Sequence, residues 1–356
     1  MQLRSGMMPG VYGLHDKEQL IEHIADIRQL AGFQRTELLQ GKGRGNEVIQ
    51  VRNGSGLQFQ IAVSRAFDIG MCELFGIPLA WMSQNGPVAP YFYEKDDWNR
   101  SFEGGLLATC GLATMGKPSV DEGRAFGPHG RISSTPAELL QAEGRWDDEG
   151  RYELIFRGIM RESTATGENL VLERTIVTRL GENRIYLTDT VTNASHQPAV
   201  HLMMHHFNFG FPLIGENCSI DIPPGPKRWI NGQGATDGWN GFPAPLECGQ
   251  PTVMVHEDVQ PDHEGGVQVQ ISNRIWHNGL AHKLRVKLHY DKAASPYLTQ
   301  WKHPGKGVYV LGIEPGNATT EGRAVHRERG TLPMLAPGER KTYTFCIEAQ
   351  LEAILT

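Results

Sequence analysis

The stretch Glu47–Val63, EVIQVRNGSGLQFQIAV, shows most directly how this chain folds. Leu57–Val63 alternates apolar and polar residues with the two-residue period of a half-buried strand, and Glu47–Arg52 reads as its partner. The link Asn53–Gly56 carries the Asn-Gly pair that is typical of a β-hairpin turn. The stretch therefore predicts two antiparallel strands joined by a tight turn.

Short segments of the same kind recur along the chain, separated by residues that favour turns. The segments are Tyr152–Arg157, Leu170–Arg179, Arg184–Asn193, Val200–Phe209, Gly266–Ser272, Leu284–Tyr290, Val308–Glu314 and Lys341–Ala349. The chain also contains 42 glycines and 21 prolines. Together these features predict an all-β protein built as a large antiparallel β-sandwich.

One segment near the start has helical periodicity instead. Within Lys17–Leu30, apolar residues recur at Leu20, Ile21, Ile24, Ile27 and Leu30. Asp16 is placed to cap this helix, and Gly32 to end it. We therefore expect residues 1–34 to form a helical extension and residues 35–356 to form one β-sandwich domain. The Gly- and Pro-rich stretch 223–251 is interpreted as a long loop within that domain.

Charge and composition exclude several classes of protein. The net charge of −6 argues against a general nucleic-acid binder, which needs a basic surface for phosphates. No stretch reaches the roughly 18 apolar residues of a membrane span, and the first residues lack the apolar run of a signal peptide. The five widely spaced cysteines are typical of reduced thiols. We therefore expect a cytoplasmic protein with neither nucleic-acid nor membrane partners.

Polar residues end apolar rows at four places, and these are the candidate functional positions. Arg65 follows Phe59, Ile61 and Val63 at the same parity, with Asp68 close behind. A structural Arg–Asp pair explains this arrangement equally well. His129 lies in the Gly- and Pro-bounded loop 127–136, where a surface position is the simpler explanation.

The other two places end longer apolar strands. In Val200–Phe211, His206 and Asn208 continue the face that carries Leu202 and Met204. In Val308–Asn317, Glu314 follows apolar residues on one face and precedes a turn. Partial burial would raise the pKa of this carboxyl and suit it to proton transfer. A buried, hydrogen-bonded histidine and a polar strand end are the alternatives without function.

The adjacent histidines also raise the question of a metal site. His205 and His206 point to opposite faces of a strand, so they cannot easily bind one ion. His201 and His205 do share a face, and with Glu314 they would form a three-ligand set. Strand parity makes this set the least favoured of the alternatives, and we expect no cofactor.

Four of these segments in this order resemble the galactose mutarotase-like superfamily, and more narrowly a bacterial group of aldose 1-epimerase-like proteins. The resemblance rests on His206–Pro212 (HFNFGFP) and Gly312–Asn317 (GIEPGN), with support from Arg65–Gly70 (RAFDIG) and the loop 127–136. It covers roughly residues 35–350. It implies a large antiparallel β-sandwich whose concave face holds a sugar.

The resemblance also implies roles for individual residues. Glu314 would be the general base, His206 the general acid, His129 an assisting histidine and Arg65 a ligand of the sugar oxygens. His205 competes with His206 for the role of the acid. Further residues are expected to bind the substrate: Asp68, His205, Asn208, Asn317, Trp301 and Arg323. Trp81, Arg124, Arg131 and Asp237 are weaker candidates for contacts with the sugar.

The leading hypothesis is thus an isomerase that interconverts the anomers of an aldose, neutral or charged. It predicts that Glu314 and either His205 or His206 face each other across a pocket at a distance that fits a pyranose ring. A sugar-binding or sensing protein without turnover, an epimerase acting at another carbon, and a metal-dependent sugar isomerase are the alternatives. The partner in each case is a small sugar, and a homodimer is compatible with all of them.

Overall fold

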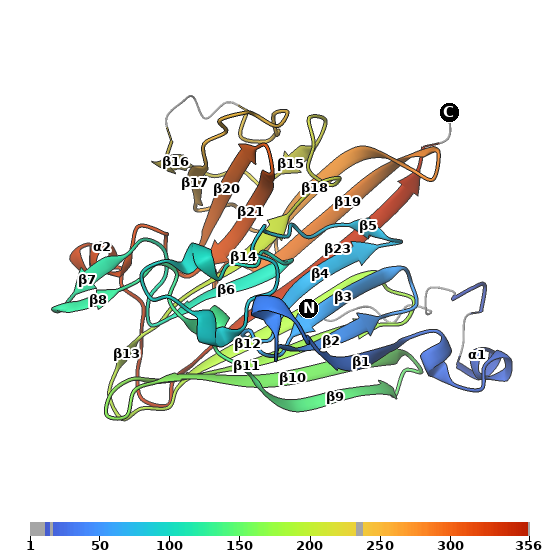
Figure 1. The fold of residues 1–356 in the computed structure, drawn as a ribbon, viewed down its shortest axis with the longest axis horizontal. Coiled ribbons are helices and arrows are strands. Elements are labelled where there is room, and N and C mark those ends of the chain that lie inside the picture. Colours follow the sequence, from blue (N-terminus) through green and yellow to red (C-terminus); the bar gives the residue numbers. More distant parts are fainter. Residues whose placement is uncertain (1–10, 15–16, 233–237, 355–356) are drawn as a thin grey trace.

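Three antiparallel sheets make up most of the protein. The structure is a computed structural model that describes residues 11–14, 17–232 and 238–354. An eight-stranded sheet extends along the molecule, and a six-stranded and a five-stranded sheet pack over it (Figure 1). The prediction of an all-β sandwich is confirmed.

The eight-stranded sheet forms one layer of the sandwich, in the order β15-β18-β19-β23-β12-β11-β10-β9. Its strands are β9 (Glu138–Trp146), β10 (Tyr152–Ser163), β11 (Asn169–Arg179), β12 (Arg184–Asn193), β15 (Ser219–Asp221), β18 (Gly266–His277), β19 (Leu280–Asp291) and β23 (Arg340–Ala353). Alternate residues of β11 are buried along its whole length, which is the pattern of a strand with one face on the core.

The six-stranded sheet, in the order β16-β17-β20-β21-β14-β6, carries His206 and Glu314, two of the predicted catalytic residues. Its strands are β6 (Leu107–Leu112), β14 (Leu202–Phe209), β16 (Lys227–Asn231), β17 (Thr252–Glu257), β20 (Tyr297–Gly305) and β21 (Val308–Gly316). All residues of β6 and β14 are buried, because chain segments cover the outer face of these strands as well.

The five-stranded sheet is built from consecutive strands. They are β1 (Gly32–Glu37), β2 (Glu47–Arg52), β3 (Leu57–Ala62), β4 (Asp68–Leu74) and β5 (Ile77–Pro78). The predicted hairpin is confirmed, since β2 pairs with β3 and the Asn53 side chain accepts a hydrogen bond from Ser55 N in the turn.

Small elements connect the sheets. The two-stranded ribbons pair β7 (Ser119–Asp121) with β8 (Arg124–Phe126) and β13 (Ala199–Val200) with β22 (Met334–Leu335). The α-helices are α1 (Lys17–His23) and α2 (Arg323–Glu328), and the 3-10 turns are η1 (Ile27–Gln29), η2 (Gly41–Gly43), η3 (Pro90–Phe92), η4 (Trp98–Arg100) and η5 (Ile132–Ser134). No helix in the described part of the chain is long and apolar enough to cross a membrane.

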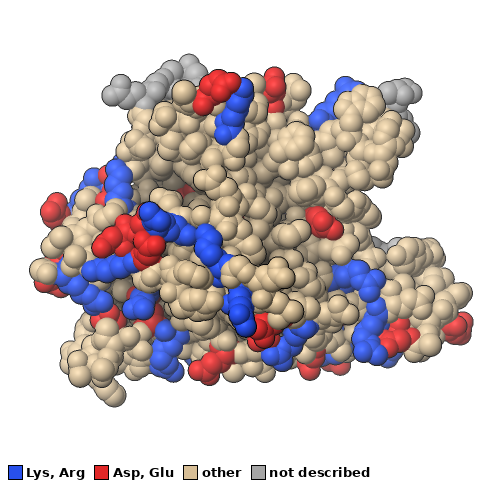
Figure 2. All heavy atoms as spheres, in the orientation of Figure 1, with Lys and Arg blue, Asp and Glu red and all other residues tan. Residues whose placement is uncertain are grey.

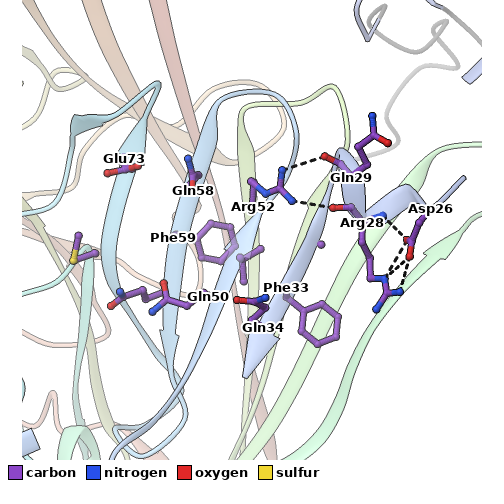
Figure 3. A pocket seen from close by; sticks show the side chains of 14 residues that line it. Asp26, Arg28, Gln29, Phe33, Gln34, Gln50, Arg52, Gln58, Phe59 and Glu73 are labelled. Atoms are coloured by element: carbon purple, nitrogen blue, oxygen red, sulfur yellow. Dashed lines mark hydrogen bonds and ion pairs between the residues drawn. The ribbon is translucent and has the colours of Figure 1, made fainter. Parts of the chain in front are cut away.

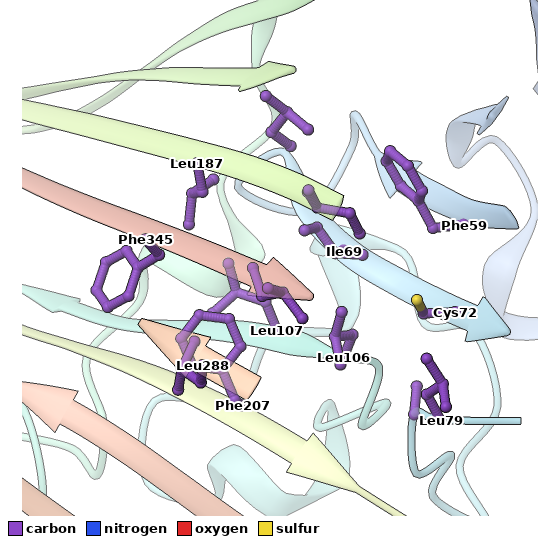
Figure 4. Close-up of a cluster of buried hydrophobic side chains, with 14 of the residues drawn as sticks. Phe59, Ile69, Cys72, Leu79, Leu106, Leu107, Leu187, Phe207, Leu288 and Phe345 are labelled. Carbon is purple, nitrogen blue, oxygen red and sulfur yellow. The ribbon is translucent and has the colours of Figure 1, made fainter. Parts of the chain in front are cut away.

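The three sheets share one hydrophobic core. Figure 4 shows side chains of this core from all three sheets: Phe59 and Cys72 from the five-stranded sheet, Phe207 from the six-stranded sheet and Phe345 from the eight-stranded sheet. A second, smaller cluster of buried residues lies on the other side of β6 and β14. Its members include Trp98, Phe102, Ala108, Cys110 and Met204.

The N-terminal helix is shorter than predicted. α1 ends at His23, and Asp26, whose backbone is extended, caps the separate turn η1 because its side chain accepts a hydrogen bond from Arg28 N. This local cap competes with a continuous helix, which explains the break. The proposed cap Asp16 lies outside the described residues. The predicted boundary at residue 34 falls inside β1, which is paired with β2.

Candidate active site

His206 and Glu314 meet on the outer face of the six-stranded sheet. The register that pairs Phe207 with Ile313 and Met204 with Gly316 places His206 of β14 opposite Glu314 of β21. Glu314 Oε1 lies 3.1 Å from His206 Nε2, and both side chains are buried. The geometry does not make this contact a hydrogen bond, so Glu314 Oε1 has no hydrogen-bond partner among the described residues. His206 Nδ1 has none either.

Burial sets the protonation of this pair. It raises the pKa of Glu314 well above the ordinary value of a glutamate. Burial, together with the smaller effect of His129, lowers the pKa of His206 from 6.5 to about 3. Both shifts favour uncharged groups. The carboxyl of Glu314 is therefore protonated, and the imidazole of His206 is neutral, with a single N–H. Moving the carboxyl proton across the 3.1 Å contact would give the ion pair without any exchange with solvent.

Aromatic rings enclose His206. The ring centroids of Trp301 and Phe102 lie 5.4 and 5.5 Å from that of His206, and the centroid of Trp98 lies 6.3 Å away. Trp301 comes from β20, whereas Trp98 and Phe102 come from the connection between β5 and β6. Trp81, from the same connection, packs edge-to-face on Trp301 at 6.2 Å. Figure 2 shows a narrow hollow in the molecular surface over β20 and β21.

His129, the predicted assisting histidine, comes from the loop 127–136 and lies beside His206. Its ring centroid lies 6.2 Å from that of His206 and 4.6 Å from that of Trp98. Burial lowers its pKa to about 4, and its Nδ1 has no hydrogen-bond partner among the described residues. The site thus contains two neutral imidazoles and a carboxyl with unused hydrogen-bonding capacity.

Arg65 lies behind the aromatic rings. Its guanidinium donates hydrogen bonds to Val88 O at 2.9 Å and to Ser101 O at 2.8 Å, and it lies 3.6 Å from Glu103. A hollow of about 20 Å³ separates it from Trp98 and Phe102, which is close to the space of a single water molecule. Arg65 therefore holds the segment that carries the rings, while its contact with a sugar stays a prediction.

Asp68 and His205 do not reach the site, contrary to the prediction that they bind substrate. His205 Nε2 lies 2.7 Å from Asp189 Oδ2, on the opposite face of β14 from His206. Arg174, which is fully buried, donates to Asp189 at 2.6 Å and to Asp68 at 2.5 Å. Asp68 also accepts a hydrogen bond from Thr109 N. Burial would raise the pKa of Asp189, but Arg174 and His205 outweigh it and lower this pKa to about 2.

The parity of β14 explains this division. His205 faces the eight-stranded sheet, where its ring packs on Phe345 at 4.3 Å, and His206 faces the aromatic cluster. The predicted Arg65–Asp68 pair is likewise divided, because Ala66 and Phe67 adopt positive φ angles and turn the chain between them. Of the two adjacent histidines, His206 is the one beside Glu314.

The side chains of Asn208 and Asn317 form hydrogen bonds with the main chain. Asn208 Nδ2 donates to Gly105 O at 3.0 Å and to His206 O at 2.9 Å. Asn317 accepts from Met203 N and donates to His201 O, both at 2.9 Å. These bonds fix the ends of β14 and β21 and leave neither amide group wholly free for a ligand.

The predicted arginines are engaged in ion pairs and stacking. Arg323 pairs with Asp121 at 2.5 Å and donates to Ala113 O at 2.8 Å. Arg124 pairs with Glu168, and Arg131 lies over the ring of Tyr93. Asp237 falls outside the described residues.

The three-ligand metal set does not come together. His201 Nε2 lies 2.8 Å from the hydroxyl of Tyr343 and His205 lies beside Asp189, whereas Glu314 is on the other face of the sheet. Among the residues that the structure describes, no three His, Cys, Asp or Glu side chains are grouped to hold a metal ion.

The sequence interpretation missed Trp98 and Phe102, which form much of the wall. They belong to the stretch 90–102, PYFYEKDDWNRSF, whose aromatic content is high for a connection between strands. That enrichment was the available signal, because an aromatic residue in a loop needs an apolar surface to cover.

Comparisons with known proteins agree with this architecture. The family model described as "Domain of unknown function (DUF4432)" matches residues 43–349. The chain belongs to the DUF4432 family. No curated protein matches this DUF4432 member in sequence.

Solved structures show the fold of this DUF4432 protein. A Klebsiella pneumoniae protein provisionally assigned as an aldose 1-epimerase is 22% identical, with a TM-score of 0.80 over 94% of this chain and 86% of its own. Galactose 1-epimerase from Lactobacillus acidophilus is 12% identical, with a TM-score of 0.57 over 90% and 99%. A galactose mutarotase-like protein from Clostridium acetobutylicum is 13% identical, with a TM-score of 0.55 over 92% and 100%. The DUF4432 chain therefore has the galactose mutarotase-like fold.

Proposed function

We propose that this protein interconverts the anomers of an aldose by acid–base catalysis, with Glu314 as base and His206 as acid. The observation that supports the proposal most is the 3.1 Å contact between Glu314 Oε1 and His206 Nε2 inside a wall of aromatic rings. A carboxyl and an imidazole that are buried without full hydrogen bonding cost free energy, which is typical of groups reserved for a ligand.

The contact is too short for a pyranose ring to lie between the two groups, unlike the arrangement expected from the sequence. It suits the anomeric centre instead. The ring oxygen and the anomeric hydroxyl oxygen are bonded to the same carbon, so the groups that serve them have to be close neighbours. The sugar would therefore approach the pair from one side, with its ring against Trp301 or Phe102.

The proposed reaction opens the sugar ring and closes it again by two proton transfers. Glu314 takes the proton of the anomeric hydroxyl while His206 gives a proton to the ring oxygen. The bond between the anomeric carbon and the ring oxygen breaks, and the aldehyde double bond forms. Rotation about the bond between the first two carbons exposes the other face of the aldehyde. The reverse transfers close the ring as the other anomer, and no electrons are gained or lost.

The protonation of the pair fits this cycle. The reaction needs one proton on the two groups together, which is the state that burial favours here. Approach of a polar sugar would shift that proton from Glu314 to His206 and create the reactive ion pair. His129, neutral because of its burial, would hold a sugar hydroxyl through its Nδ1, which no described residue engages.

Saturation-transfer NMR of anomer exchange on a panel of neutral and charged aldoses tests the proposal. We expect faster exchange for at least one sugar, and a loss of about 10²- to 10⁴-fold in the Glu314→Gln variant. Glu216→Gln, at an exposed position, is the matched control. Exchange that Glu314→Gln leaves unchanged would refute the assignment. Binding of a sugar without any acceleration would instead favour a sugar-binding protein.

A further inference from the structure

A second, separate hollow lies on the outer face of the five-stranded sheet. Its volume is about 610 Å³, within the usual size of ligand sites. The strands β1 to β4 form the floor, and the turn η1 forms one wall (Figure 3). Val51 of β2 and Phe59 of β3 also line the hollow, but both are almost fully buried and belong to the hydrophobic core.

Glutamine side chains dominate the floor. Gln34, Gln50 and Gln60 are direct cross-strand neighbours on β1, β2 and β3, as the registers of these strands show. Gln58 lies in the adjoining row, between Arg52 and Glu73. At about 4.8 Å per strand, the three-glutamine row is an evenly spaced ladder of carboxamides roughly 10 Å long.

These carboxamides are not used by the part of the chain that the structure describes. The described residues provide no hydrogen-bond partner for the side chains of Gln34, Gln50, Gln58 or Gln60. Each carboxamide offers two donors and an acceptor that accepts twice. The floor therefore presents both kinds of group at regular intervals.

Hydrogen bonds hold the walls of this hollow in place, and the charges of their side chains sum to zero. Arg52 donates to Arg28 O at 2.9 Å and to Gln29 O at 3.2 Å, which fixes η1 at the side of the floor. Asp26 pairs with Arg28, and the remaining carboxylate at the site, Glu73, balances Arg52. An ionic ligand thus gains little here. Met71, which is 47% exposed, supplies apolar surface at the opposite wall.

We propose that this hollow, which we call the glutamine groove, binds a neutral oligosaccharide. Hydroxyl groups donate and accept at once, so a row of sugar hydroxyls matches a row of free carboxamides better than a charged ligand does. A peptide is disfavoured because the main-chain groups of β2 and β3 are already paired on both sides. This inference does not depend on the reaction proposed for Glu314.

Side-chain amide signals of glutamine give a direct test. The chain labelled with ¹⁵N at glutamine is titrated with maltotriose and cellotriose, with glucose as the single-unit comparison, and Gln34, Gln50 and Gln60 are assigned by substitution. We expect one trisaccharide to shift these signals. Gln50→Ala should weaken its binding about tenfold, because the central member of the ladder is removed.

Two controls locate the effect. Gln268→Ala changes an exposed glutamine on β18 of the eight-stranded sheet and should leave binding of the trisaccharide unchanged. Glu314→Gln in the candidate active site should leave it unchanged as well. Shifts by neither trisaccharide, or equal losses in Gln50→Ala and Gln268→Ala, would overturn the proposal. Signals that move on dilution rather than on addition of sugar would overturn it as well, since a second copy of the chain would then cover the groove.

Discussion

Gly312 precedes Glu314 by two residues on the same face of β21, and its missing side chain leaves the space in which Glu314 meets His206. A Cβ atom at Gly312 would lie inside contact distance of Glu314 Oε1 and 3.1 Å from His206 Cε1. It would also lie 3.1 Å from Cβ of Trp301. One glycine therefore sets the approach of the carboxyl, the imidazole and the aromatic wall.

Replacing Gly312 with Ala should abolish most of the proposed activity without unfolding the protein. The added methyl group pushes the Glu314 carboxyl away from His206, and a displacement of about 1 Å can cost about 100-fold in rate. Anomer exchange and urea unfolding measure the two effects. Gly241→Ala is the control, because a Cβ there meets no atom within 4 Å. A fully active Gly312→Ala variant would contradict the importance of the contact.

The buried network behind the site should matter for stability. In Asp189→Asn, Arg174 keeps its contact with Asp68 but loses its main counter-charge while fully buried. Breaking such a pair typically costs about 3–5 kcal/mol of the free energy of unfolding. The control is Glu173→Gln, one residue before Arg174 on β11. It removes the half-exposed ion pair with Arg157 and should cost at most about 1 kcal/mol. Equal losses of unfolding free energy in the two variants would contradict a special contribution of the buried network.

Much of the fold could be predicted from the sequence because its strands alternate cleanly. β2 and β12 have the predicted bounds, and β11 differs by one residue. The strand β6, which does not alternate, was missed. β6 is buried on both faces, so every residue from Leu107 to Leu112 is hidden and the two-residue period disappears.

The candidate site was predicted in part for the same reason. Strand parity separated His206 from His205, and the turn chemistry marked Glu314. Parity could not reveal that Asp68 pairs with Arg174, since these residues are 106 positions apart and come from different sheets. Nor could it place Trp98 beside His129, because both lie in irregular connections whose course depends on the packed sheets.

Trp301 should contribute to sugar binding more than to the chemical step. Its ring is half-buried and stands edge-to-face to His206, so Trp301→Ala removes a platform but neither proton-transfer group. We expect KM for anomer exchange to rise about tenfold, since such a contact contributes about 1 kcal/mol or more. Trp276→Ala, a tryptophan that is 73% exposed on β18, should leave KM unchanged. A large fall in kcat alone would show that Trp301 acts on the chemistry instead.

His201 should make the protein less stable in mild acid. Burial, aided by His205, lowers its pKa from 6.5 to about 3. The unfolded chain therefore binds a proton below pH 6.5 that the folded protein does not, and the stabilisation from this group is lost as the pH falls from 6.5 toward 3. At about pH 5 the loss amounts to about 2 kcal/mol of the free energy of unfolding.

His201→Gln removes the imidazole that takes up this proton in the unfolded chain and keeps a polar partner for the hydroxyl of Tyr343. Urea unfolding at about pH 8 and about pH 5 should show the variant gaining about 2 kcal/mol relative to the parent at the lower pH. His263→Gln is the control, at a position whose side chain is 91% exposed, and should differ from the parent by no more than about 0.5 kcal/mol at both pH values. A constant difference between His201→Gln and the parent would mean that His201 becomes protonated without unfolding the chain around it.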